Sequence, residues 1–222
     1  MHQPWGGPLR NSIVSDRLPW INEVVAGIVL EWVEDGHRVS WVHLVELVPA
    51  GDLCFYLSCS QVAPPEILDR FQHNLVVHES DLPLGRGWSP LSWQIIEGAS
   101  DIAVTIFEAE SSVDSGVIYA HEWLHFDGTE LLSKLRSAQA VAAIGLCRNL
   151  VAEYPASVLR GRPQVGPDTS YRRRTPSDSA LDPDVPLAEQ FHLLRVVDNE
   201  RYPATLELRG GKYRVFIQRT TE

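Results

Sequence analysis

Residues 73–90 read HNLVVHESDLPLGRGWSP, and this stretch indicates how the chain folds. Its apolar run, Leu75 to Val77, is short enough for a buried strand and leads directly into His78. The acidic segment that follows contains proline and glycine, which is typical of a loop. We therefore expect a buried strand that ends by placing a histidine at the edge of a sheet.

Short apolar runs and helical segments alternate over most of the chain. The spacing of apolar residues predicts helices over 20–34, 64–71, 89–97 and 128–153, and strands over 12–15, 38–43, 53–57, 75–77, 102–107 and 116–124. This alternation favours an α/β fold with a mostly parallel sheet and helices on both faces. In such sheets ligands bind beyond the carboxyl ends of the strands, which is where His78 is expected.

The composition divides the chain into three parts. Residues 1–155 are expected to form the α/β domain, and the proline-rich residues 156–186 a linker. Residues 187–222 combine a helical pattern with two short strand patterns around Gly210 and Gly211. We therefore expect a small C-terminal appendage made of one helix and a β-hairpin.

The charge and cysteine content narrow the classes of partner. The 222 residues carry a formal net charge of −10, which makes nucleic acid an improbable partner because phosphate binding draws on clustered cations. The basic run 171–174 is typical of a solvated or salt-bridged loop, and a phosphate or carboxylate site is the alternative. Three cysteines, and no N-terminal segment with the apolar length of a signal peptide or membrane span, favour a cytoplasmic protein without membrane contact.

His78 and Asp114 are the strongest candidates for chemistry. Asp114 lies in a turn between two expected strands, so both residues lie at loop ends of the same sheet. A carboxylate beside an imidazole fixes its tautomer and stabilises its protonated form. A surface histidine beside turn acids is the alternative interpretation.

Several other chemistries lack their sequence signals. No cysteine and histidine spacing resembles a zinc site, so no metal is expected. The chain has no GxGxxG, no glycine-rich phosphate loop ending in Gly-Lys-Ser/Thr, and no GxSxG. Dinucleotide redox chemistry, phosphoryl transfer and serine hydrolysis all lose support.

The motifs around His78 occur in an order that resembles the formyltransferase superfamily, which includes methionyl-tRNA formyltransferase. The likeness covers roughly residues 50–155, and its five motifs are His78-Glu-Ser-Asp-Leu-Pro83, Arg86-Gly87, Pro90 with Trp93 and Gly98, Val104-Thr-Ile106, and Val113-Asp-Ser-Gly116. The tail, with Arg173-Arg-Thr-Pro-Ser-Asp-Ser179, is similar to that of sugar-nucleotide N-formyltransferases. The type acting on UDP-4-amino-4,6-dideoxy-N-acetyl-β-L-altrosamine is the most similar. The resemblance implies a Rossmann-like catalytic domain.

The resemblance also implies a reaction. A primary amine on a nucleotide-linked amino sugar attacks the formyl carbon of 10-formyltetrahydrofolate, and a tetrahedral intermediate bearing an oxyanion forms. His78 would stabilise the oxyanion and relay the amine proton, while Asp114 holds and polarises His78. The family pattern places folate against Leu57, Ser58, Cys59, Arg86, Glu108 and Val113.

Val76 departs from the family pattern. The family places an asparagine two residues before the histidine, where its amide donates to the formyl oxygen, and valine has no donor. Ser80, Gln94 and Asn74 are candidate replacements. On a regular strand Asn74 is about 13 Å from His78, at ~3.3 Å per residue.

Two other functions stay open at this point. The same residues with water as acceptor would make a 10-formyltetrahydrofolate hydrolase, and Val76 also motivates a catalytically weak folate- or nucleotide-binding pseudoenzyme. The expected partner is a small-molecule amine acceptor, and pairing of two copies into a homodimer is plausible.

Overall fold

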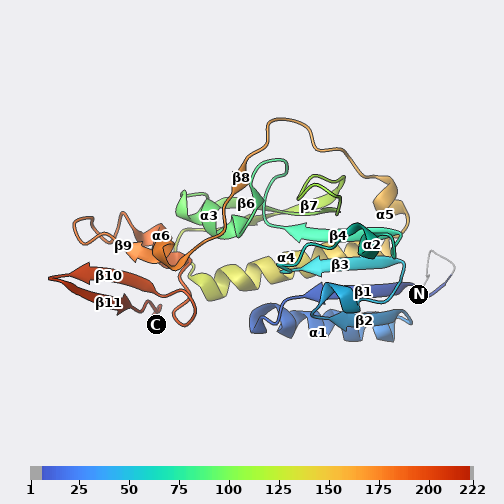
Figure 1. Ribbon diagram of the computed structural model, residues 1–222, viewed down its shortest axis with the longest axis horizontal. Coiled ribbons are helices and arrows are strands. Elements are labelled where there is room, and N and C mark those ends of the chain that lie inside the picture. The colour runs from blue at the N-terminus through green and yellow to red at the C-terminus, as the bar shows by residue number, and fades with distance from the viewer. Residues whose placement is uncertain (1–6, 221–222) are drawn as a thin grey trace.

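A six-stranded sheet forms the centre of the protein (Figure 1). The computed structural model describes residues 7–220, apart from the side chain of Pro19. The strands lie in the order β2-β1-β3-β4-β6-β7, with bounds β1 Arg10–Ser15, β2 Arg38–Val42, β3 Leu53–Leu57, β4 His73–His78, β6 Asp101–Glu108 and β7 Ile118–His125. The expected Rossmann-like α/β fold is confirmed.

Five strands of this sheet, β7 included, run in the same direction, and β6 runs the opposite way. β2, β1, β3 and β4 run in the same direction, whereas β6 is antiparallel to both of its neighbours, β4 and β7. In Figure 1 the arrowheads of β3 and β4 point toward the C-terminal part of the chain. The carboxyl edge of the parallel strands therefore faces that part.

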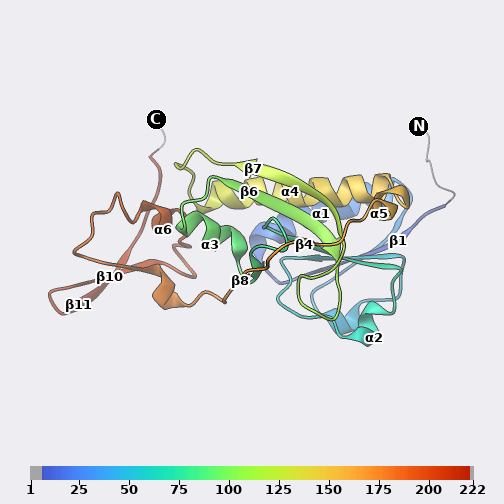
Figure 2. The same ribbon diagram turned by 90° about the horizontal axis from the view of Figure 1, so that it is seen from above.

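Helices cover both faces of the sheet unequally. The long helices α1 (Pro19–Glu34) and α4 (Leu132–Ala152) lie on one face, and α2 (Pro65–Leu68) with the 3₁₀ turn η1 (Val45–Leu47) on the other (Figure 2). Alternate strand residues serve the two layers, as pleating requires: Phe55 packs under Trp32 of α1, and Tyr56 faces the α2 side. The short helix α3 (Pro90–Ile96) follows the glycine-containing loop after β4.

Residues 156–186 run along the domain and pair with it. They contain α5 (Ala156–Leu159), β8 (Ser170–Tyr171), η2 (Pro176–Ser179) and β9 (Ala180–Leu181). β8 pairs with β5 (Arg86–Gly87) in the loop after His78. The segment that was expected to be a linker thus contacts the loop of the candidate site.

The C-terminal part holds a short helix and the expected hairpin. α6 (Phe191–Arg195) precedes β10 (Ala204–Leu208) and β11 (Gly211–Val215), which are joined by Arg209 and Gly210, both with positive φ. β9 adds a third strand, and a separate apolar cluster lies beneath these strands. The expected division at 155 and 186 remains a prediction, and its outer ends, 1–6 and 221–222, lie outside the described residues.

Some helices are shorter than their sequence patterns predict. The pattern over 64–71 gives only the four residues of α2, because Arg70 and Phe71 donate to carbonyls three residues back. The pattern over 187–197 gives only α6, and the turns before it carry the same three-residue spacing. Apolar periodicity is satisfied by such turns as well as by an α-helix.

Candidate active site

A cavity of about 500 Å³ lies at the carboxyl edge of the parallel strands. Its walls come from the ends of β3 and β4, from α4, and from the loop 109–117 between β6 and β7. The C-terminal part closes the remaining side with residues near 173 and 201. Strand direction and the return of the C-terminal part thus place the cavity where His78 was expected.

His78 is the last residue of β4 and lines the cavity with its side chain almost entirely buried. Its Nε2 lies 2.9 Å from the carbonyl oxygen of Gly85. Because a carbonyl only accepts, Nε2 carries the proton. The loop after the strand therefore orients the ring by bringing a carbonyl oxygen back to it.

Asp114 faces the same nitrogen. Its Oδ2 is 3.7 Å from His78 Nε2, which is within ion-pair distance but too long for a hydrogen bond. The backbone N–H of Gly87 donates to this oxygen at 2.8 Å, and the amide of Gln164 donates to the Asp114 carbonyl at 2.9 Å. Asp114 has a φ of 52°, a left-handed conformation that needs such support. The two catalytic candidates are thus brought together, with the loop of β5 and the segment 156–186 holding the aspartate.

Glu79 is a third ionisable group in the cavity, and sequence reasoning missed it. Protein surrounds its carboxyl, although the cavity keeps part of the residue accessible. The amide of Gln139 on α4 donates to its Oε1 at 2.6 Å. Burial raises the pKa of Glu79; His78, Gln139 and the backbone N–H of Glu79 itself lower it, and Asp114 raises it. The signal was its position beside His78, but strand alternation would turn neighbouring side chains apart.

None of the three candidate donors for the formyl oxygen lines the cavity. Asn74 donates to the Leu68 carbonyl and accepts from Tyr56, and Gln94 donates to the carbonyls of Glu79 and Pro90. Ser80 is fully buried, and its hydroxyl has no partner among the described residues.

The position of the family's asparagine is apolar in this structure. Val76 lines the cavity floor with Phe107. A hydrocarbon side chain offers no hydrogen bond to a formyl oxygen.

The residues expected to contact folate divide into two groups. Ser58, Cys59 and Val113 line the cavity. Leu57 is buried in the core, Arg86 pairs with Asp168 at 3.2 Å, and Glu108 binds His73 and the backbone N–H of Asn74. The second group supports the walls and does not line them.

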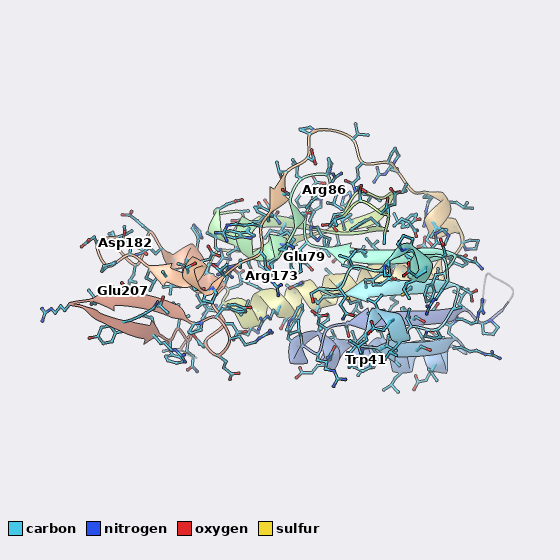
Figure 3. The ribbon with its side chains drawn as sticks, in the orientation of Figure 1. Trp41, Glu79, Arg86, Arg173, Asp182 and Glu207 are labelled. Carbon is cyan, nitrogen blue, oxygen red and sulfur yellow. The ribbon has the colours of Figure 1, made fainter. Side chains whose placement is uncertain are left out.

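Arginines gather where the C-terminal part meets the cavity. Arg136, Arg173, Arg174 and Arg201 line it, and Figure 3 shows Glu79 and Arg173 at the border between the sheet and this part. The Arg173 guanidinium lies over the Trp88 ring, 4.8 Å from the centroid. Arg136 is paired with Asp198 at 3.1 Å, whereas no described carboxylate pairs with Arg173 or Arg201. The basic run of the sequence is therefore partly a cavity wall.

Residues 7–220 contain neither a metal-binding cluster nor a membrane-spanning helix. No group of three or more histidine, cysteine and acidic side chains is arranged to hold a metal ion there. Within the same residues, no helix has the length and apolar character needed to cross a bilayer.

Comparison with known proteins places this site in a family context. Residues 44–143 match the family described as formyl transferase. Methionyl-tRNA formyltransferase from Clostridium thermocellum is similar over 92% of this chain and 90% of its own, with 23% identity and a TM-score of 0.75. A 4-N formyltransferase from Francisella tularensis is similar over 98% of this chain and 100% of its own, with 16% identity and a TM-score of 0.70.

A longer protein shares the same fold over part of its length. HypX from Aquifex aeolicus in complex with tetrahydrofolic acid has 17% identity and a TM-score of 0.77, over 94% of this chain and 37% of its own. At these identities, the solved structures establish the fold.

Proposed function

We propose that this chain, whose residues 44–143 match the formyl transferase family, moves the formyl group of 10-formyltetrahydrofolate to a primary amine of a nucleotide-linked amino sugar. The observation that carries the proposal is the placement of His78 and Asp114 together at the inner end of a cavity at the carboxyl edge of the sheet. Acyl transfer needs a positioned group that carries a proton near neutral pH, and imidazole is that group.

His78 stabilises the oxygen of the formyl group as it gains negative charge and passes a proton to the departing nitrogen. A fixed donor at a developing oxyanion lowers the activation free energy by about 3 kcal/mol. Asp114, 3.7 Å away, supports the positive charge of the imidazolium. With Val76 in place of the asparagine, these two side chains act without an amide donor at that position.

The cavity fits a folate-derived formyl donor in size and character. A volume of about 500 Å³ lies within the range of small-molecule sites, and the cavity lining combines apolar and polar side chains. Ser58, Cys59 and Val113 are the expected residues that line it, so we propose that they hold the donor. The donor supplies an activated formyl group, and the chain supplies position and charge.

The arginines at the cavity entrance support a nucleotide-linked acceptor. Arg173 and Arg201 carry charge without a carboxylate partner among the described residues, and guanidinium groups bind phosphate oxygens in pairs. Trp88 and Tyr202 line the same region and present aromatic surface to a base. The acceptor would then leave its diphosphate at the C-terminal wall and extend its amine toward His78.

A panel of nucleotide-linked 4-amino sugars tests the proposal. Each sugar is incubated with the protein and 10-formyltetrahydrofolate, and mass spectrometry records the gain of one formyl group. We expect product with at least one uridine- or thymidine-diphosphate sugar. Folate binding with no formylated product from any sugar contradicts the proposal, and formate release without an amine favours the hydrolase.

A cytoplasmic homodimer is part of the same proposal. Tyr213 and Phe216 at the C-terminal hairpin are exposed apolar side chains, which suit pairing with a second copy. Light scattering on the purified protein tests this, and a monomer at micromolar concentration contradicts it.

A further inference from the structure

Glu79 is a surrounded carboxyl that neither the fold nor the pair of His78 and Asp114 accounts for. Carboxylates are rarely buried without a cation, and among the described residues no lysine or arginine pairs with Glu79. Its one side-chain partner is the neutral amide of Gln139, itself buried. Perturbed carboxyls without a structural cation occur preferentially in functional sites.

We propose that Glu79 is a catalytic residue that accepts the proton which the acceptor's ammonium group must lose before it can attack. This inference rests on the proposed function. His78 is the last residue of β4, and Glu79 is the next residue in the chain. Both side chains line the cavity. An amine bound against His78 would therefore lie within reach of Glu79.

The proton balance of the reaction needs two acceptors. Aliphatic amines have pKa values between about 8 and 10.5, so the acceptor arrives as R–NH₃⁺ at neutral pH. One proton leaves for the Glu79 carboxylate, and the free electron pair of R–NH₂ then forms the new carbon–nitrogen bond. After attack the same nitrogen loses a second proton, which His78 delivers to N10 of the folate as the old carbon–nitrogen bond breaks. The products are R–NH–CHO and tetrahydrofolate, and Glu79 returns its proton to solvent.

Asp114 is less suited to the first of these steps. Its Oδ2 already accepts from the Gly87 N–H and faces His78. In Glu79, Oε1 is held by Gln139, and the other oxygen has no side-chain partner among the described hydrogen bonds. Two carboxylates that line the same cavity as His78 would thus divide the work, one serving His78 and the other the amine.

The groups around Glu79 determine the sign of the pH dependence. His78 on β4 and Asp114 on the loop 109–117 are the ionisable groups that act on it. The neighbouring helices face Glu79 with the neutral amides of Gln139 and Gln94. Because burial raises the pKa of Glu79, its protonated form persists to higher pH than in an exposed glutamate, and kcat/KM falls as the pH drops through this raised pKa.

The variant Glu79→Gln tests the inference with UDP-4-amino-4,6-dideoxy-N-acetyl-β-L-altrosamine as acceptor, or with the sugar that gives most product in the panel above. We expect kcat/KM to fall 10- to 100-fold at pH 7, with the loss shrinking to a few-fold near pH 9.5. The reason is that free amine then arrives from solution without needing an acceptor. Glu34→Gln, at the exposed end of α1, makes the same change in net charge as a control.

A second variant keeps the test valid if Glu79→Gln does not fold. Gln139→Leu removes the amide whose hydrogen bond lowers the pKa of Glu79. The acid limb of the kcat/KM profile should therefore move to higher pH, while tetrahydrofolate binding, followed by fluorescence, stays within two-fold. A purely structural anchor between β4 and α4 would lower activity equally at every pH.

The activity of the wild-type protein tests the proposed function, and the comparison with Glu79→Gln tests the role of Glu79. If wild-type protein formylates no amine, the proposed function is wrong. If wild-type protein formylates the sugar and Glu79→Gln does so equally well, or with a loss that is constant from pH 6 to 9.5, Glu79 does not accept the proton.

Discussion

The two ends of the cavity hold their charges in opposite ways. At the inner end, neutral backbone or amide groups hydrogen-bond the buried His78 and the half-buried Glu79 and Asp114. At the entrance, Arg173 is exposed and rests on the ring of Trp88. Burial raises the pKa of the Glu79 carboxyl, whereas an exposed guanidinium stays charged and its field is screened by salt. The inner end is thus suited to proton transfer and the entrance to binding.

His78→Ala, at the inner end of the cavity, should lower the catalytic rate more than any other substitution proposed below. Removing the imidazole leaves the oxyanion and the departing nitrogen without their proton carrier, so we expect kcat to fall about 10³-fold, which corresponds to ~4 kcal/mol. KM for the sugar should change less than three-fold. Stopped-flow or mass-spectrometric rates measure this, and a kcat within ten-fold of wild type would remove His78 from the mechanism.

Asp114→Asn should give the next largest effect. The amide oxygen can still accept from the Gly87 N–H, so the loop is expected to keep its conformation while the negative charge opposite His78 is lost. We expect kcat to fall about 10²-fold with an unchanged unfolding temperature. A fall in kcat that is accompanied by a lower unfolding temperature would instead indicate that Asp114 acts only by bracing the loop.

Arg173→Gln should give the smallest effect and affect binding alone. Loss of one phosphate-binding cation is expected to raise KM for the nucleotide sugar five- to ten-fold at low salt, with kcat unchanged. The difference from wild type should shrink at high ionic strength, because salt already weakens the wild-type contact.

The neighbouring arginine provides the matched control for that variant. Arg172 is paired with Asp178 and does not line the cavity, so Arg172→Gln should leave KM within two-fold. A similar rise in KM for both variants would show that the basic run acts through its overall charge.

The stretch around His78 was predictable because its signals are local. The apolar run 75–77 and the loop after it placed a histidine at the carboxyl edge of a sheet, and β4 ends at that residue. Asp114 was selected because it lies in a turn between two strands, but this turn leaves β6 opposite the start of β4, and only the path of the folded loop carries Asp114 to His78. The hairpin was also predicted from Gly210 and Gly211; the two left-handed positions are Arg209 and Gly210, so the glycines located the turn to within one residue.

The partners of those residues could not be predicted in the same way. Gly85 holds His78 through a backbone carbonyl, and every residue has one, so no side-chain type marks it. Gln164 braces Asp114 from 50 residues along the chain, within a segment that the composition made look like a linker. Ser80, Gln94 and Asn74 looked like available donors, but only the folded structure shows that none of them lines the cavity.

Three features followed from the amino-acid sequence alone: a buried strand, a histidine at its end, and an aspartate on another loop of the same domain. These follow from burial and turn chemistry, which act over a few residues. Only the tertiary structure decided that Glu79 shares the cavity with His78, because the chain bends after β4 and α4 brings Gln139 to meet the carboxyl. Burial, and with it the proton affinity of a carboxyl, depends on everything that surrounds the group, and one stretch of chain does not contain that information.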